Sequence, residues 1–90
     1  MNDDQMMRHL RSVGMECFVT HLALFSGAQS QVDAAADLQS RTGWTSAACR
    51  TRVSKARALI AAGRVDAVLA LIAVSGRMTE GTRAAARAAR

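Results

Sequence analysis

Residues 40–63 read SRTGWTSAACRTRVSKARALIAAG, and this stretch decides the predicted fold. It contains a turn signal at Gly43, and two positions later Thr45, a residue type that favours the N-cap of a helix. On a helix over 46–62, one side collects apolar residues: Cys49, Val53, Ala56 and Ile60, with Leu59 and Ala48 beside them. The pattern predicts a long helix that buries this side and turns the other side outward.

The outward side of this predicted helix is small, polar or basic: Ala47, Arg50, Thr51, Ser54, Arg57 and Ala61. It carries no carboxylate. The major groove of B-DNA admits one α-helix, and large apolar or acidic side chains would obstruct contact with phosphates and base edges. The composition of this side is therefore typical of a helix that enters a major groove.

A second helix is predicted just before it. Ser30 with Asp33 three residues later approximates a capping box, and Gly43 ends the segment. Four residues of this helix are expected to face inward: Val32, Ala35, Ala36 and Leu38. A helix, a turn of about three residues containing glycine, and a longer basic helix form a helix-turn-helix, here over 30–62.

Residues 37–60, DLQSRTGWTSAACRTRVSKARALI, resemble the helix-turn-helix of region 4 in sigma-70-type factors and of related response-regulator domains. The resemblance rests on Leu38, Thr42, Gly43, Trp44, Arg52, Val53, Ser54, Lys55, Ala56, Arg57 and Leu59. It covers only this part of the chain, because the flanking helices do not match a sigma factor. It implies DNA binding through the motif, without promoter recognition by a polymerase subunit.

The resemblance also implies roles for single residues. Ser46, Ala47, Arg50 and Thr51 would occupy the turns that read bases, and Arg52, Lys55 and Arg57 would contact phosphates. From its place on the same outer side, Ser54 joins the base-reading set. Arg41 and Thr45, on either side of the turn of the motif, join the backbone-contacting set.

The composition of the 90-residue chain fits a small all-α protein, because it has no proline, six glycines and 3% aromatic residues. A chain of this length supports one core and one domain, 1–90. Gly14, Gly27, Gly43, Gly63 and Gly76 each follow an apolar run and predict helix ends. We predict a bundle of five to six helices, with segments at about 3–13, 15–26, 30–42, 46–62, 65–75 and 79–90.

Charge is distributed unevenly along the sequence. Residues 41–90 carry ten basic and two acidic groups, a balance of +8, whereas residues 1–40 have a balance of −3. A one-sided positive charge favours a polyanionic partner, nucleic acid before membrane. In the tail, 79–90, we expect Arg83, Arg87 and Arg90 to form either a basic arm on the DNA backbone or a frayed, solvated end.

Segments 15–26 and 65–75 are apolar on most sides, which is more apolar surface than a small monomer easily covers. We therefore expect a homodimer that places two reading helices about one DNA turn, ~34 Å, apart. The expected interface consists of Phe18, Leu22, Phe25, Val68, Leu69 and Ile72. The alternative is a monomer with a five-helix core.

Other functions find less support. Cys17 and Cys49 are expected to be reduced core thiols, and His21 a hydrogen-bonded core residue. A zinc set of Cys17, His21, Cys49 and His9 matches no known spacing, so we expect no metal and no cofactor. No segment suits a membrane span or signal peptide, which favours a cytoplasmic protein. Dispersed acids and the lack of a phosphate loop argue against an enzyme with a small-molecule substrate.

One alternative to DNA binding stays open. The same helices could hold a protein partner, as in a small basic inhibitor or adaptor of the kind that phages and plasmids encode. The salt dependence of binding to random duplex DNA separates the two, because phosphate contacts release counterions and protein contacts do not.

Overall fold

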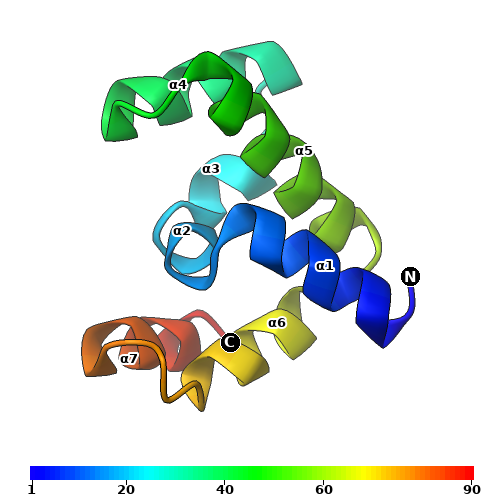
Figure 1. Cartoon of the computed structure of the whole chain (residues 1–90), viewed down its shortest axis with the longest axis vertical. Coiled ribbons are helices and arrows are strands. Elements are labelled where there is room, and N and C mark those ends of the chain that lie inside the picture. The colour runs from blue at the N-terminus through cyan, green and yellow to red at the C-terminus, as the bar shows by residue number, and fades with distance from the viewer.

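The computed structural model describes the whole chain, residues 1–90, and contains helices and no strands (Figure 1). The predicted all-α fold is thus confirmed. The helices are α1 (Asp3–Val13), α2 (Met15–Thr20), α3 (Leu22–Ser26), α4 (Gln31–Thr42), α5 (Ser46–Ala61), α6 (Val65–Ala73) and α7 (Glu80–Ala89). None of them combines the length and apolar character that a bilayer crossing requires.

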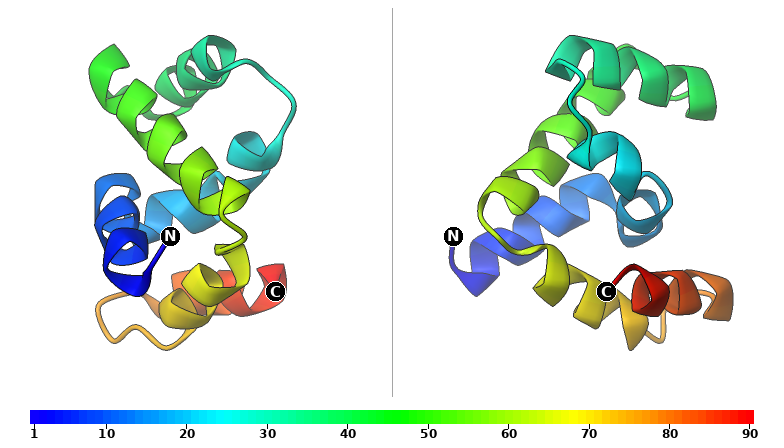
Figure 2. Two further views of the ribbon diagram at one scale, coloured as in Figure 1. Left: turned by 90° about the vertical axis from the view of Figure 1, so that its right-hand side faces the viewer. Right: turned by 180° about the vertical axis from the view of Figure 1, so that it is seen from behind.

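Helix α5 runs through the middle of the molecule and joins its two ends (Figures 1 and 2). At one end α4 packs against α5, and α1 packs along α5 farther toward the other end. Helices α6 and α7 pair with each other at that other end, and α7 also contacts α2. The helix-turn-helix segment therefore stands at one extremity of the molecule, supported by α1 and α3.

Local capping explains where the helices begin. Ser30 Oγ accepts a hydrogen bond from the Asp33 amide at 3.1 Å, and Thr45 Oγ1 accepts one from the Ala48 amide at 3.1 Å. Both N-caps lie where the sequence predicts them. Asp33 gives no reciprocal side-chain bond, so α4 carries half of the expected capping box.

The core contains 19 buried residues, and none of them is polar or charged. Its largest fully buried side chains come from six helices: Leu10, Phe18, Phe25, Leu38, Leu59, Leu69 and Ile72. Helix α7 contributes the small buried residue Ala86. On α5, Leu59 is fully buried and Ile60 only partly, a small rotation from the predicted stripe.

The segment predicted as one helix over 15–26 is two short helices that meet at His21, where φ is −112° and ψ is 19°. The bend brings the rings of Phe18 and Phe25 to 6.4 Å between centroids. Seven residues of a straight helix would separate their backbones by ~10.5 Å. The change of chain direction at His21 thus lets both rings pack in the same core.

The inward side of α4 also differs from the prediction. Val32 is 74% exposed and Ala36 is exposed, while Ala34, Ala35 and Leu38 are buried. The three buried residues form a stripe on which neither Val32 nor Ala36 falls, because both lie more than 100° around the helix from its centre, at about 100° per residue.

The expected dimer interface is wrong for five of its six residues. Phe18, Phe25, Val68, Leu69 and Ile72 are at most 1% exposed within a single chain. Only Leu22 keeps partial exposure. Helix α7 packs on α6 and α2 and covers apolar surface there, while α3, which carries Phe25, packs against α2, α4 and α5.

Residues 79–90 form neither a frayed end nor a free basic arm. Thr79 caps α7, and the heads of its arginines bind groups of the same chain. Arg83 donates to the carbonyl oxygens of Ser75 and Met78, Arg87 to that of Ala73, and Arg90 to the Asp66 carboxylate at 3.0 Å.

A pair of truncations tests this core. Phe18→Ala should lower the free energy of unfolding by about 3–5 kcal/mol, because it empties a fully enclosed site. Val32→Ala, on the exposed side of α4, should change it by less than about 0.5 kcal/mol. Urea denaturation followed by circular dichroism measures both, and equal effects of the two variants would contradict the described core.

Candidate nucleic-acid interface

The turn between α4 and α5 is held by a short chain of hydrogen bonds. Gly43 has a left-handed backbone, φ +77°, and its amide donates to the Gln39 carbonyl at 2.8 Å. Thr42 Oγ1 donates to the Leu38 carbonyl at 2.8 Å and accepts from the Trp44 amide at 3.2 Å. The positive φ explains the glycine, since other residues are strained there. These bonds fix the direction in which α5 leaves the turn.

The residues expected to read bases lie together on the outer side of α5. Ser46, Ala47, Arg50, Thr51 and Ser54 are all exposed. The Arg50 guanidinium donates to Ser46 Oγ at 2.8 Å and meets no carboxylate. Their side chains are a guanidinium, three hydroxyls and a methyl group. These can donate to base acceptors or touch a thymine methyl group.

Arg52, expected on phosphate, makes two contacts within the fold. Its Nη1 donates to the Val13 carbonyl at 2.5 Å, and its Cζ lies 4.1 Å from the centroid of the Trp44 ring. The guanidinium therefore binds the last carbonyl of α1 and also stacks on Trp44 in the turn. These contacts connect α1, the turn and α5, so we assign Arg52 to positioning α5.

Arg57 has a similar place at the end of α3. Its Nε donates to the Phe25 carbonyl at 3.2 Å and one Nη to the Gly27 carbonyl at 3.5 Å. Arg41 pairs with Asp37 at 2.9 Å on the surface of α4. Of the residues expected on the DNA backbone, Lys55 and Thr45 are thus the ones whose side chains donate to no group of the chain. Thr45 Oγ1 accepts the capping bond and keeps its own hydrogen to donate.

Sequence reasoning missed basic residues on α1. Besides Arg50, four cations contact no carboxylate and no carbonyl oxygen: Arg8, Arg11, Lys55 and Arg77. Arg8 and Arg11 belong to the part of the sequence, residues 1–40, whose net charge is negative. The net charge of that part therefore gives no sign of a basic surface. Their spacing of three, on the polar side of an amphipathic helix, is the signal that could have revealed them.

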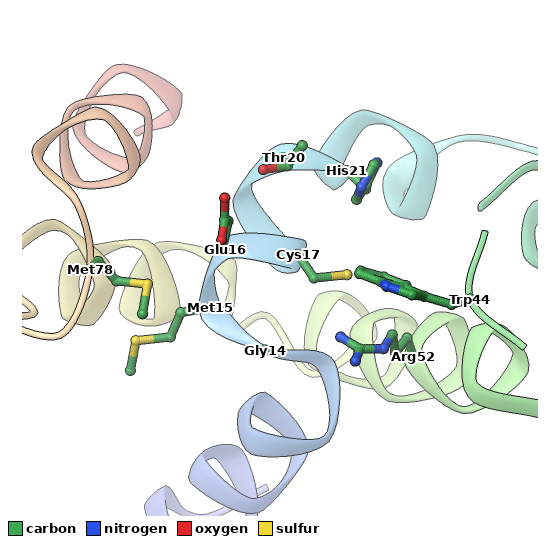
Figure 3. A pocket seen from close by; sticks show the side chains of 9 residues that line it. All are labelled: Gly14, Met15, Glu16, Cys17, Thr20, His21, Trp44, Arg52 and Met78. Carbon is green, nitrogen blue, oxygen red and sulfur yellow. The ribbon is translucent and has the colours of Figure 1, made fainter. Parts of the chain in front are cut away.

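A cavity of about 430 Å³ lies beside the Arg52–Trp44 contact (Figure 3). In Figure 3 the Cys17 side chain points toward Trp44 and Arg52, and His21 stands above the indole ring. Burial raises the pKa of the Cys17 thiol, and the neighbouring Arg52 opposes that shift. The cysteine is buried and reduced, as expected, and so is Cys49.

His21 is not the hydrogen-bonded core residue that the sequence predicts. Its ring is partly buried, edge-on to Phe25 and Trp44, and its Nδ1 has no hydrogen-bond partner. Burial, followed by the charge of Arg41, lowers its pKa below the ordinary 6.5. No three His, Cys, Asp or Glu side chains converge in the structure as metal ligands would.

Comparisons with models of known protein families, with curated proteins and with solved structures find no match to this chain. The resemblance of residues 37–60 to the sigma-type helix-turn-helix therefore stays a prediction, and the function has to be argued from the site itself.

The role of Arg52 can be measured against a neighbour on the same helix. Arg52→Met should lower the free energy of unfolding by about 2 kcal/mol, because it removes a charged hydrogen bond and a cation–π contact. Arg50→Met, whose head has only a hydroxyl partner on the surface, should cost less than about 0.5 kcal/mol. Urea denaturation compares the two variants. A loss of stability in Arg52→Met that is no larger than the loss in Arg50→Met would refute the role of Arg52 in positioning α5.

His21 should make stability depend on pH. Because its pKa is lower in the folded chain, the unfolded chain binds more protons as pH falls below 6.5, so stability decreases in that direction. His21→Gln should flatten this part of the curve. Measurements should stay above about pH 5, because the pKa values of Asp66 and Glu80 are also lowered, from 3.8 and 4.5, by their arginine partners. A His21→Gln curve with the wild-type slope would contradict the assignment.

Proposed function

We propose that this chain is a small DNA-binding protein that inserts the N-terminal half of α5 into the major groove of duplex DNA. The observation that carries the proposal is the exposed, acid-free side of α5 formed by Ser46, Ala47, Arg50, Thr51 and Ser54. It begins at an ordered turn and stands at one extremity of the molecule (Figure 1). Within this proposal the protein acts as a transcriptional regulator.

Arg50 is the central residue of this side of α5. It is the one guanidinium among the five exposed residues, and a guanidinium can donate to both O6 and N7 of a guanine. Ser46 holds it at 2.8 Å in the free protein, which limits its motion before binding. The net charge of +5 would assist approach to DNA over a long range.

Arg50→Ala tests the proposal directly. Duplexes preferred by the wild-type protein are first selected from a random library. The variant should bind them about 5–150-fold more weakly than the wild type and lose selectivity at one base pair, because a bidentate base contact is lost. Arg77→Ala is the matched control, because Arg77 is exposed, carries the same charge and lies outside the motif. Equal binding by Arg50→Ala and wild type would overturn base reading by α5.

A homodimer on a pseudo-palindromic site remains part of the proposal. One reading helix makes few phosphate contacts, and two copies would double them. Any such dimer must use surface other than the five interface residues that are enclosed in the single chain. Light scattering at micromolar concentration, with and without the selected duplex, measures the mass; a monomer in both conditions would remove this part.

A second candidate function is supported by a different surface. Met6 and Met7 of α1 face Ala67, Ala70 and Leu71 of α6 across a groove of about 540 Å³. Methionine-lined apolar grooves accept amphipathic helices of partner proteins. A protein partner held in this groove would contact α1 and α6, not the helices of the helix-turn-helix that the sequence-based alternative uses. Such complexes would resist salt concentrations that dissociate DNA.

A further inference from the structure

A polar groove runs between α1 and α5 next to the proposed reading side. It measures about 300 Å³ and is lined by Gln5, Arg8, His9, Ser12 and Lys55, with no apolar side chain among them. Four of these residues come from α1 and one from α5. Two separate helices thus bring their polar side chains to one place.

The groove offers donors that the fold itself does not use. The heads of Arg8 and Lys55 contact no carboxylate and no carbonyl oxygen of the chain. By contrast, Arg52 and Arg57, on the same helix as Lys55, both bind backbone carbonyls. The two cations of the groove are therefore free to meet an external anion without breaking a contact that stabilises the fold.

The surroundings of the groove are weakly acidic at most. Asp4 lies near Arg8 and Arg11 farther along α1, yet it forms no ion pair with either. Asp3, on the same turn, pairs with Arg64. The positive charge of Arg8 is thus not neutralised by contact, and Arg11 adds to it one turn away.

The position of Lys55 connects the groove with the reading side of α5. Lys55 follows Thr51 by four residues, so their side chains are neighbours on the helix surface. A helix in the major groove lies between two phosphate backbones, at a groove width of about 12 Å. Cations beside such a helix, displaced toward a neighbouring helix, face one of those backbones.

We propose that the groove formed by Gln5, Arg8, His9, Ser12 and Lys55 binds phosphates of the DNA strand that borders the major groove occupied by α5. The inference rests on the proposed function and adds α1 as a second contacting element. Arg8 and Lys55 supply the charge, and the side-chain NH2 of Gln5 can donate a further hydrogen bond. Ser12 and His9 bond backbone carbonyls of α1 and line the groove without adding free donors. The phosphates are assigned to duplex DNA because Lys55 adjoins the reading side of α5.

Salt dependence of binding tests the groove with matched variants. Removal of one cation that binds a phosphate should reduce the slope of log Kd against log salt by about 0.9. Arg8→Gln and Lys55→Gln should each show this smaller slope, and both should weaken binding to selected and random duplexes by the same factor. Arg77→Gln, an exposed and unpaired arginine outside the groove, should keep the wild-type slope. Circular dichroism and thermal melting check that the variants fold.

A second measurement needs no variant. Lys55 is the single lysine of the chain, so an amine acylating reagent has two targets, its ε-amine and the N-terminus. Duplex DNA should slow acylation of Lys55 at least several-fold relative to the N-terminus, measured by mass spectrometry. Inorganic phosphate at the same phosphate concentration should not.

The outcomes separate the two proposals. If Arg8→Gln and Lys55→Gln bind DNA with the wild-type salt slope, phosphate binding by the groove is overturned. The same holds if duplex DNA does not slow the acylation of Lys55. Neither result affects the proposal that α5 reads bases. A selective loss of sequence preference in these variants also overturns phosphate binding by the groove, because phosphates carry no sequence information. Failure of the wild-type protein to bind any duplex at low salt overturns both, and protection by phosphate alone indicates a small-anion site instead.

Discussion

The guanidinium of Arg52 is the contact on which the arrangement of this protein depends. It joins the last carbonyl of α1 to the indole of Trp44, and so connects an N-terminal helix with the turn that precedes α5. The hydrogen bond spans 39 residues of sequence. A charged donor on an unsatisfied helix-end carbonyl is worth more than a neutral one, since both groups are partly removed from water. Together with the packing of α1 along α5, this contact fixes the orientation of the two helices.

The same chemistry recurs at other helix ends and changes the meaning of the net charge. Arg57 donates to carbonyls at the end of α3, and Arg87 donates to the last carbonyl of α6. Helix C-termini leave such carbonyls without partners and attract cations. Several arginines that make the sequence look like a nucleic-acid binder are therefore structural. Arginines bound to carbonyls keep their charge, so the net charge stays +5. The basic side chains without a carboxylate or carbonyl partner are fewer, and four of the five lie on α1 and α5.

Features with local causes were predictable from the sequence. Thr45 and Ser30 cap their helices because a hydroxyl can reach an amide three residues on, wherever the helix lies in the fold. The stripe of Cys49, Val53 and Ala56 is buried because its period matches the helix. The exposure of the proposed reading side follows from the same periodicity.

Features with tertiary causes were not predictable in this way. The break at His21 depends on where Phe18 and Phe25 meet, which no local signal encodes. The apolar surface of α6 looked like an interface because the sequence does not reveal that α7, with a single buried alanine, covers it. Likewise the groove of Arg8 and Lys55 joins residues 47 positions apart and exists only once α1 packs on α5.

The late position of α7 in the chain has a consequence for synthesis in the cell. A chain whose synthesis is interrupted before Glu80 lacks the helix that covers α2 and α6. It exposes apolar surface with nothing of its own to shield it, a state prone to aggregation. A product that stopped short of Glu80 would keep that surface permanently and become a substrate for chaperones and proteases.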